Sequence, residues 1–102
     1  MAGQVERFIR IQAPAHGAGA KAWHTLPNCE KLAVWEYLAL IAPNELTGAD
    51  EKRMVFHIRF VDGVRKGARV TFLGNHFIVL TVSDSTRLVG LELNCIPAEV
   101  SP

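Results

Sequence analysis

Alternating apolar and polar residues in the last third of the chain predict three short β-strands within residues 69–95. Gly74-Asn75 suits a two-residue hairpin turn, because both residues tolerate positive φ and the flanking residues favour β-structure. Short polar side chains at residues 83–85 indicate the second turn. In the third strand, apolar residues alternate with small or polar ones: Val89, Leu91, Leu93 and Cys95 against Gly90, Glu92 and Asn94. The pattern is typical of an antiparallel meander with one buried face.

Two earlier segments alternate in the same way. Residues 5–12 predict an edge strand whose apolar side consists of Val5, Ile9 and Ile11. Residues 54–61 have the strongest pattern outside the last third and direct Phe56 and Phe60 into the expected core. Asp62-Gly63 then turns the chain toward the meander.

Residues 31–42 are ambiguous between a helix and a strand. Leu, Ala, Glu and Lys favour a helix, which Asn28 could cap. Glu30, Lys31 and Glu36 would lie at widely separated angles around that helix, so it would lack a continuous apolar stripe. The residues alone leave both structures open, and Pro43 ends either one.

Two segments are expected to form loops. Residues 13–30 are rich in Ala, Gly, Pro, His and Asn without a period, and we expect Trp23 to fold back onto the domain. Residues 44–52 are polar and form at most one helical turn, because Thr47 and Asp50 have a spacing close to that of a capping box. We therefore predict a mainly β fold: a small antiparallel β-barrel or barrel-like sandwich of about six strands.

Length and composition restrict the protein to one ordinary globular domain, residues 1–102. The net charge of +1 indicates no particular partner. No apolar run reaches the about 18 residues that span a bilayer, and the charged first residues do not resemble a secretory signal, so we expect a cytosol-like compartment and no membrane contact. Cys29 and Cys95 lie far apart outside any metal or redox motif, which predicts free, buried thiols.

The residues offer little for catalysis or metal binding. His24 and Cys29 form a single loose pair inside a loop, whereas a zinc site needs four ligands. His57 and His76 are expected to be solvated or hydrogen-bonded at the surface. No nucleophile elbow, phosphate loop or dinucleotide fingerprint is present, so we expect neither enzymatic activity nor a cofactor or metal.

Basic residues are concentrated in residues 52–69, where only Asp62 opposes them: Lys52, Arg53, Arg59, Arg65, Lys66 and Arg69. A small β-barrel with such a face could bind single-stranded nucleic acid, but stacking aromatic side chains would be needed beside the charges. A solvated face or a subunit contact is therefore the favoured interpretation. Residues 44–51 contain acidic residues and no basic one, so in a ring one subunit's acidic loop could contact its neighbour's basic face.

The order and spacing of several short patterns resemble the phage head-tail joining proteins, the head-closure or stopper subunits of long-tailed phages and gene transfer agents. The resemblance spans nearly the whole chain. It depends on Arg10-Ile11-Gln12, Trp23, Val34-Trp35, His57-Ile58-Arg59-Phe60, Arg69-Val70, Gly74-Asn75, Phe77-Ile78 and Leu91-Glu92-Leu93-Asn94-Cys95.

The resemblance implies a virion protein, assembled in the bacterial host cytoplasm, that forms a homo-oligomeric ring at the head-tail interface. The ring would bind the portal or adaptor protein above and the tail or tail-terminator protein below, and packaged double-stranded DNA would pass through it. A channel-gate loop is implied at Asn44, Glu45, Leu46, Thr47, Gly48, Ala49, Asp50 and Glu51. Subunit or partner contacts are implied at Trp23, His24, Lys52, Arg53, Arg59, Arg65 and Lys66. The family also has a strand at residues 31–42.

The chain departs from the family in two places. Trp23 and Trp35 are farther apart than expected, which indicates an insertion at residues 24–31. The gate loop is short, so a helix often found there would be reduced to one turn or absent. Two alternative functions remain: a tail-terminator or tail-completion protein with a similar small β-fold, and a nucleic-acid-binding β-barrel that uses residues 52–69.

Overall fold

The computed structural model describes residues 7–14, 22–43, 46–85 and 90–98. Within them the chain forms seven β-strands and no helix. The strands are β1 (Phe8–Pro14), β2 (Trp23–Thr25), β3 (Leu32–Pro43), β4 (Asp50–Ile58), β5 (Arg69–Phe72), β6 (Asn75–Asp84) and β7 (Leu91–Pro97). The predicted mainly β fold is confirmed, and the strand beyond the predicted six is β2, within a segment expected to be a loop.

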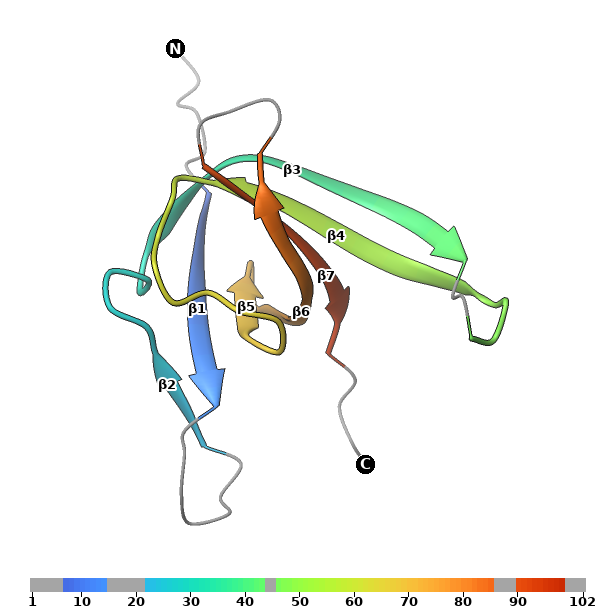
Figure 1. Cartoon of the computed structure of the whole chain (residues 1–102), viewed down its shortest axis with the longest axis horizontal. Helices are drawn as coiled ribbons and strands as arrows, with labels where there is room; N and C mark the ends of the chain where they lie inside the picture. The colour runs from blue at the N-terminus through green and yellow to red at the C-terminus, as the bar shows by residue number, and fades with distance from the viewer. Residues whose placement is uncertain (1–6, 15–21, 44–45, 86–89, 99–102) are drawn as a thin grey trace.

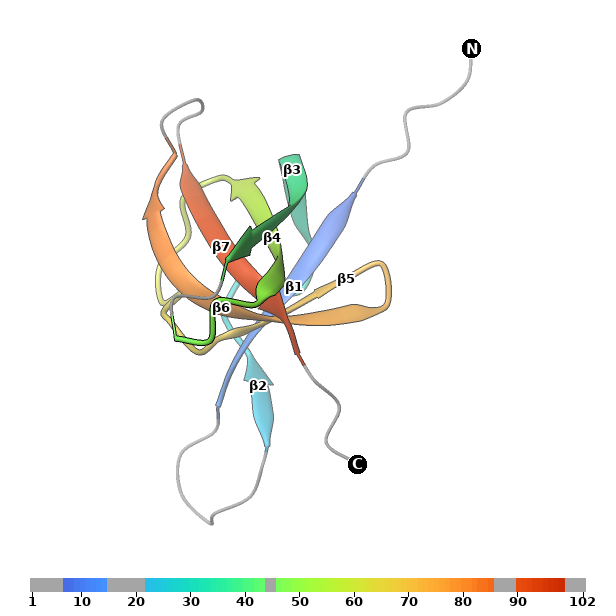
Figure 2. The same ribbon diagram turned by 90° about the vertical axis from the view of Figure 1, so that its right-hand side faces the viewer.

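All strand pairs are antiparallel, and the hydrogen bonding runs in the order β2-β1-β3-β4-β7-β6-β5. A further pairing of β5 with β1 closes this sheet on itself (Figure 1). β1 makes closure possible because it uses both edges: β5 pairs along one, while β3 and β2 pair along the other. Figure 2 shows the strands curving around a common centre.

The buried faces of these strands form one core. Apolar side chains at alternate positions of β1, β4 and β7 point inward, as predicted, and Phe56 is their fully buried centre. Its ring packs edge-on against Phe72 and Phe77, with centroids 5.1 and 5.7 Å away. Burying each such side chain contributes about 1.5–3 kcal/mol. Val5 and Val89, which were predicted to join this core, lie outside the described residues.

The segment predicted at residues 31–42 is a strand, β3, as the family resemblance implied. β3 pairs with β4 from Val34↔Ile58 to Pro43↔Asp50, with a bulge at Trp35. Asn28 does not cap a helix: it has a φ of 62° in a turn before β3. The helix propensity of the segment is overridden because its backbone groups are satisfied by a long neighbouring strand.

Both predicted turns of the meander are displaced in the structure. The hairpin between β5 and β6 turns at Leu73-Gly74, with φ values of 50° and 80°, and Asn75 already pairs with Phe72 in β6. Ser83 and Asp84 belong to β6, where they pair with β7. The next connection therefore begins after them.

The prediction that Phe60 is a core residue is wrong. β4 ends at Ile58, so the alternation stops there: Phe60 is 62% exposed, while Val61 is buried. At the matching end of β7, Gly90 lies so close to β4 that a Cβ atom would overlap the carbonyl oxygen of Ile58. Residues 59–68 leave the sheet and form the connection from β4 to β5.

Both cysteines are free and buried, as predicted. Burial raises the pKa of the Cys95 thiol from 9.0 to about 12. Burial also raises the pKa of Cys29, against the opposing influence of Arg59.

We therefore expect both thiols of the folded protein to react with an aromatic disulfide reagent more than about a hundredfold more slowly than in guanidinium, because reaction requires opening. The raised pKa also predicts that stability falls as the pH rises from 9.0 toward about 12, since only the unfolded chain ionises Cys95 there. Thiol titration and denaturation at several pH values measure both effects. Rapid labelling of the folded protein at pH 8 would contradict the buried placement.

Candidate functional site: the assembly surfaces

The most distinctive surface is a hairpin that projects from the closed sheet. β7 pairs with β4 only between Met54 and Ile58, so residues 50–53 of β4 pair with β3 alone. Residues 40–53 thus form a two-stranded ribbon and its connection, here called the hairpin arm. Figure 1 shows the ends of β3 and β4 extending well beyond the other strands. Backbone pairing between β3 and β4 maintains the shape of the arm, while few of its side chains are covered by the core.

Apolar side chains are exposed along β3 and the arm. Leu38 is 57% exposed, Ile41 is 68% exposed, and Leu46, in the connection, is 95% exposed. The bulged Trp35 is also exposed. β3 has one charged residue, Glu36, in its twelve. Apolar surface of this extent on a strand is typical of a protein interaction site.

The outer edge of β3 is largely open. On the side away from β4, its ladder with β1 consists of Phe8↔Ala33 and Ile9↔Leu32, extended by a hydrogen bond from the Val34 amide to the Arg7 carbonyl. From residue 35 to residue 43, no other strand of the described chain pairs with this edge. Open strand edges of soluble proteins are normally blunted or covered, so this edge is a candidate contact surface.

An apolar hollow lies where the arm leaves the sheet. Its volume is about 400 Å³. The residues that line it come from β3 and β4 at the base of the arm and from β6 and β7: Ala39, Leu40, Ile41, Lys52, Arg53, Met54, Phe77 and Pro97. The hollow adds a concave apolar site to the exposed faces of the arm.

The gate-loop residues occupy the end of the arm. Asn44 and Glu45 lie outside the described residues. Leu46, Thr47, Gly48 and Ala49 lie in the connection, where the Ala49 amide donates a 3.2 Å hydrogen bond to the Thr47 hydroxyl. Gly48 adopts a φ of 74°, and no helical turn forms in the described part. Asp50 and Glu51 were predicted to lie in this loop. In the structure they are instead the first residues of β4.

The basic residues of the segment 52–69 do not form one continuous face. Arg53 is on the arm and forms a 3.1 Å ion pair with Glu51. Arg69 is on β5, where it donates to Gln12 at 2.6 Å and lies over the Trp23 ring at 4.7 Å. The tertiary structure therefore disperses the cluster, because residues 52–69 span two strands and a long connection.

Arg59, Arg65 and Lys66 all belong to the connection from β4 to β5, which lies on the other side of the molecule from the arm (Figure 1). Two hollows flank this connection, with volumes of about 460 and 370 Å³, and Gly63 lines both. His24, an exposed residue of β2, lines the second hollow with Arg65 and Lys66. We call residues 59–68 with these two hollows the basic end.

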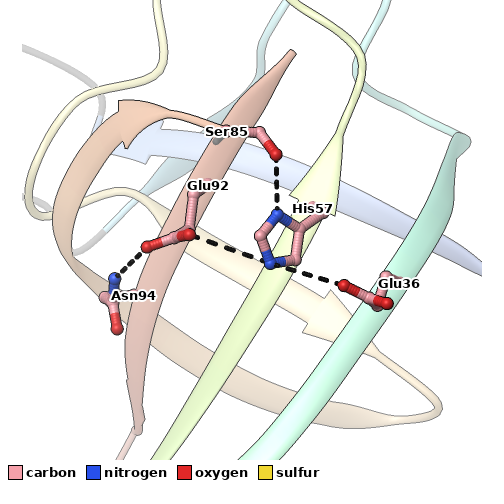
Figure 3. Close-up of polar contacts among 5 residues, drawn as sticks. All are labelled: Glu36, His57, Ser85, Glu92 and Asn94. Carbon is pink, nitrogen blue, oxygen red and sulfur yellow. Dashed lines mark hydrogen bonds and ion pairs between the residues drawn. The ribbon is translucent and has the colours of Figure 1, made fainter. Parts of the chain in front are cut away.

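Sequence reasoning missed a polar cluster at the centre of the sheet (Figure 3). His57 is 6% exposed, so its placement at the surface was wrong, although its hydrogen bonding is confirmed. Its Nδ1 lies 3.0 Å from the Ser85 hydroxyl, and its Nε2 lies 3.9 Å from Glu36 and 3.8 Å from Glu92. Asn94 donates to the other oxygen of Glu92 at 3.2 Å.

The cluster follows from strand register. Glu36, His57 and Glu92 are direct cross-strand neighbours on β3, β4 and β7. Polar residues that face each other on neighbouring strands are the signal that could have revealed the cluster. That signal depends on the register of the strands, which only the three-dimensional structure shows. Among the described residues, no group of His, Cys, Asp or Glu could hold a metal ion. The cluster instead lies across three neighbouring strands, β3, β4 and β7.

Comparison with known proteins supports the fold. No family model and no curated protein match the chain. Among solved structures, the fold is similar to that of the protein xkdH of the phage-like element PBSX from Bacillus subtilis, with a TM-score of 0.57. The similarity covers 91% of this chain and 94% of that chain at 11% sequence identity. The two chains therefore share a fold over nearly their whole lengths. Across the described ranges, no helix is long and apolar enough to cross a membrane.

We expect the double substitution Leu38→Thr with Ile41→Thr to change the free energy of unfolding by no more than about 0.5 kcal/mol, because both side chains are exposed and threonine suits a strand. The matched control is Ile58→Thr, which alters the fully buried Ile58 and is expected to cost about 2 kcal/mol or more. Chemical denaturation measures both. Equal losses in the two variants would show that these β3 side chains belong to the core.

Proposed function

We propose that this protein is a structural virion subunit that forms a ring between the portal or adaptor and the tail of a phage-like particle. The observation that carries the proposal is the hairpin arm, a projecting ribbon with exposed apolar side chains on β3 and in the connection and with an open strand edge, on an otherwise closed body. Its apolar surface and its edge need a protein partner.

Three further points support this role. The fold is shared with a protein of a phage-like element over nearly the whole of both chains. The closed sheet gives a rigid body on which the arm and the basic end are held apart. In the polar cluster, Glu36 and Glu92 are partly exposed but His57 itself is buried, so its imidazole lies inside the sheet and is not offered at a surface. The subunit acts by assembly and without catalysis, a cofactor or a metal, and it resides in the virion after assembly in the host cytoplasm.

The arm also suits the channel of such a ring. Fixed positive charge beside DNA would hold the phosphates and slow their passage. The connection and the start of β4 carry Asp50 and Glu51 and no basic residue between residues 46 and 51. A narrow, acidic hairpin end can therefore face packaged double-stranded DNA without retaining it.

A nucleic-acid-binding role is the second candidate, and one observation favours it. Phe60 is exposed next to Arg59, so the basic end has an aromatic side chain of the kind that stacks on bases. The dispersal of Arg53 and Arg69 into contacts within the chain argues against a continuous groove for a strand. Salt-dependent binding of single-stranded DNA by the purified protein would favour this candidate over the ring.

Assembly is the first test of the proposed function. We expect the purified protein, alone or mixed with the portal-adaptor complex of its particle, to form rings visible by negative-stain microscopy and of matching mass. Binding to completed heads before tails identifies a head-closure subunit. Preferential binding to isolated tail tubes would instead identify a tail terminator, and a monomer in every mixture would refute the ring.

The gate is tested by shortening the arm. Pro43 pairs with Asp50, so replacing residues 44–49 with Asn-Gly keeps both strands and closes the hairpin with a favoured turn. We expect the variant to remain folded, while filled heads lose DNA. Released DNA is measured by nuclease sensitivity, with Thr47→Ala as the control that leaves the arm at full length. Heads that retain their DNA normally would remove the gating role from the arm.

A further inference from the structure

The two ends of the molecule differ in the charges at their surfaces: the arm ends in Asp50 and Glu51, with Lys52 and Arg53 behind them, and the basic end carries Arg59, Arg65 and Lys66. The end of the hairpin arm and the basic end lie on opposite sides of the closed sheet, as Figure 1 shows. The sheet separates them, so the two surfaces of one chain cannot contact each other. Each surface is therefore available to another copy.

The end of the arm is an apolar knob with adjacent acids. Leu46 is 95% exposed. Asp50 and Glu51 follow it on β4, and both lie beyond Lys52 and Arg53 on the way out from the body. Glu51 pairs with Arg53 at 3.1 Å, while Asp50 is exposed opposite Pro43 at the last rung of the ladder.

The basic end offers a complementary surface. Arg59, Arg65 and Lys66 are exposed there, with Asp62 as the one acid between residues 59 and 68. Phe60 is 62% exposed beside the hollow of about 460 Å³. The second hollow, of about 370 Å³, adjoins it through Gly63. An exposed apolar side chain with the Asp50 carboxylate near it suits these hollows, because basic side chains line them.

We propose that the arm end of one copy docks on the basic end of the next, with Leu46 at the hollows beside Phe60 and with Asp50 facing Arg59 and Arg65. The inference rests on the proposed ring and names the contact that builds it. Such a contact joins two different surfaces, so it repeats from copy to copy and closes into a ring when the rotation allows. Salt weakens it, because the facing charges are exposed.

Mixing two single-cysteine variants tests the contact directly. Thr47→Cys places a thiol at the arm end, and Asp62→Cys places one at the basic end. Cys29 and Cys95 are buried and are not expected to form cross-links. We expect oxidation of an equal mixture to give a mixed dimer at least tenfold above either like pair. The double-cysteine chain is expected to give a ladder of higher oligomers, and the unsubstituted chain no cross-link.

Charge reversal supplies the matched control. Asp50→Lys on the first variant, or Arg59→Glu with Arg65→Glu on the second, is expected to reduce the mixed dimer at least tenfold. Combining the two reversals restores it, provided that circular dichroism shows each variant folded. Loss without restoration would overturn the charge pairing.

The outcomes separate this contact from the ring itself. Rings in negative stain without the mixed dimer overturn the contact and leave the ring standing. Absence of both rings and mixed dimer overturns both proposals. Loss of the mixed dimer on adding single-stranded DNA, with DNA binding that Arg59→Glu abolishes, would assign the basic end to nucleic acid and overturn the subunit contact.

Discussion

The pairing of β1 with β5 is the constraint on which the rest of the structure depends. Four residue pairs, from Ile9↔Phe72 to Gln12↔Arg69, join the first strand to the meander and close the sheet. Ile11 and Val70 are opposite each other there and fully buried. Without these pairs, the sheet would have two further open edges and the core around Phe56 would lose its cover. Closure therefore makes a rigid body from a chain without a described helix.

Closure also explains why the hairpin arm projects. β3 has twelve residues and β4 has nine, whereas β7 pairs with only five residues of β4. No further strand of the closed sheet lies beside the remaining residues, so they continue outward as a ribbon. The polar cluster around His57 lies within the closed sheet and connects β3, β4 and β7. The arm is thus anchored at its base and exposed along its length, as an assembly element needs to be.

Several features could be predicted from residue patterns because each depends on neighbours in the chain. Alternation predicted the buried faces of β1, β4 and β7, and the lack of any cysteine motif predicted two free thiols. Leu73-Gly74 shows where such reasoning reaches its limit: a turn was expected at this point, yet its position depended on how Phe72 and Asn75 pair. Phe60 was misplaced because the end of β4 is set by its partner β7.

The sequence by itself determined that the chain is a small antiparallel β-domain with one core, since period-two alternation and turn residues act locally. Only the tertiary structure decided which residues face outward together. It buried His57 between two carboxylates, dispersed the basic residues of segment 52–69, and left the outer edge of β3 open. These outcomes depend on register and closure, which bring together residues far apart in the chain. The surfaces proposed for assembly are therefore products of the closed sheet.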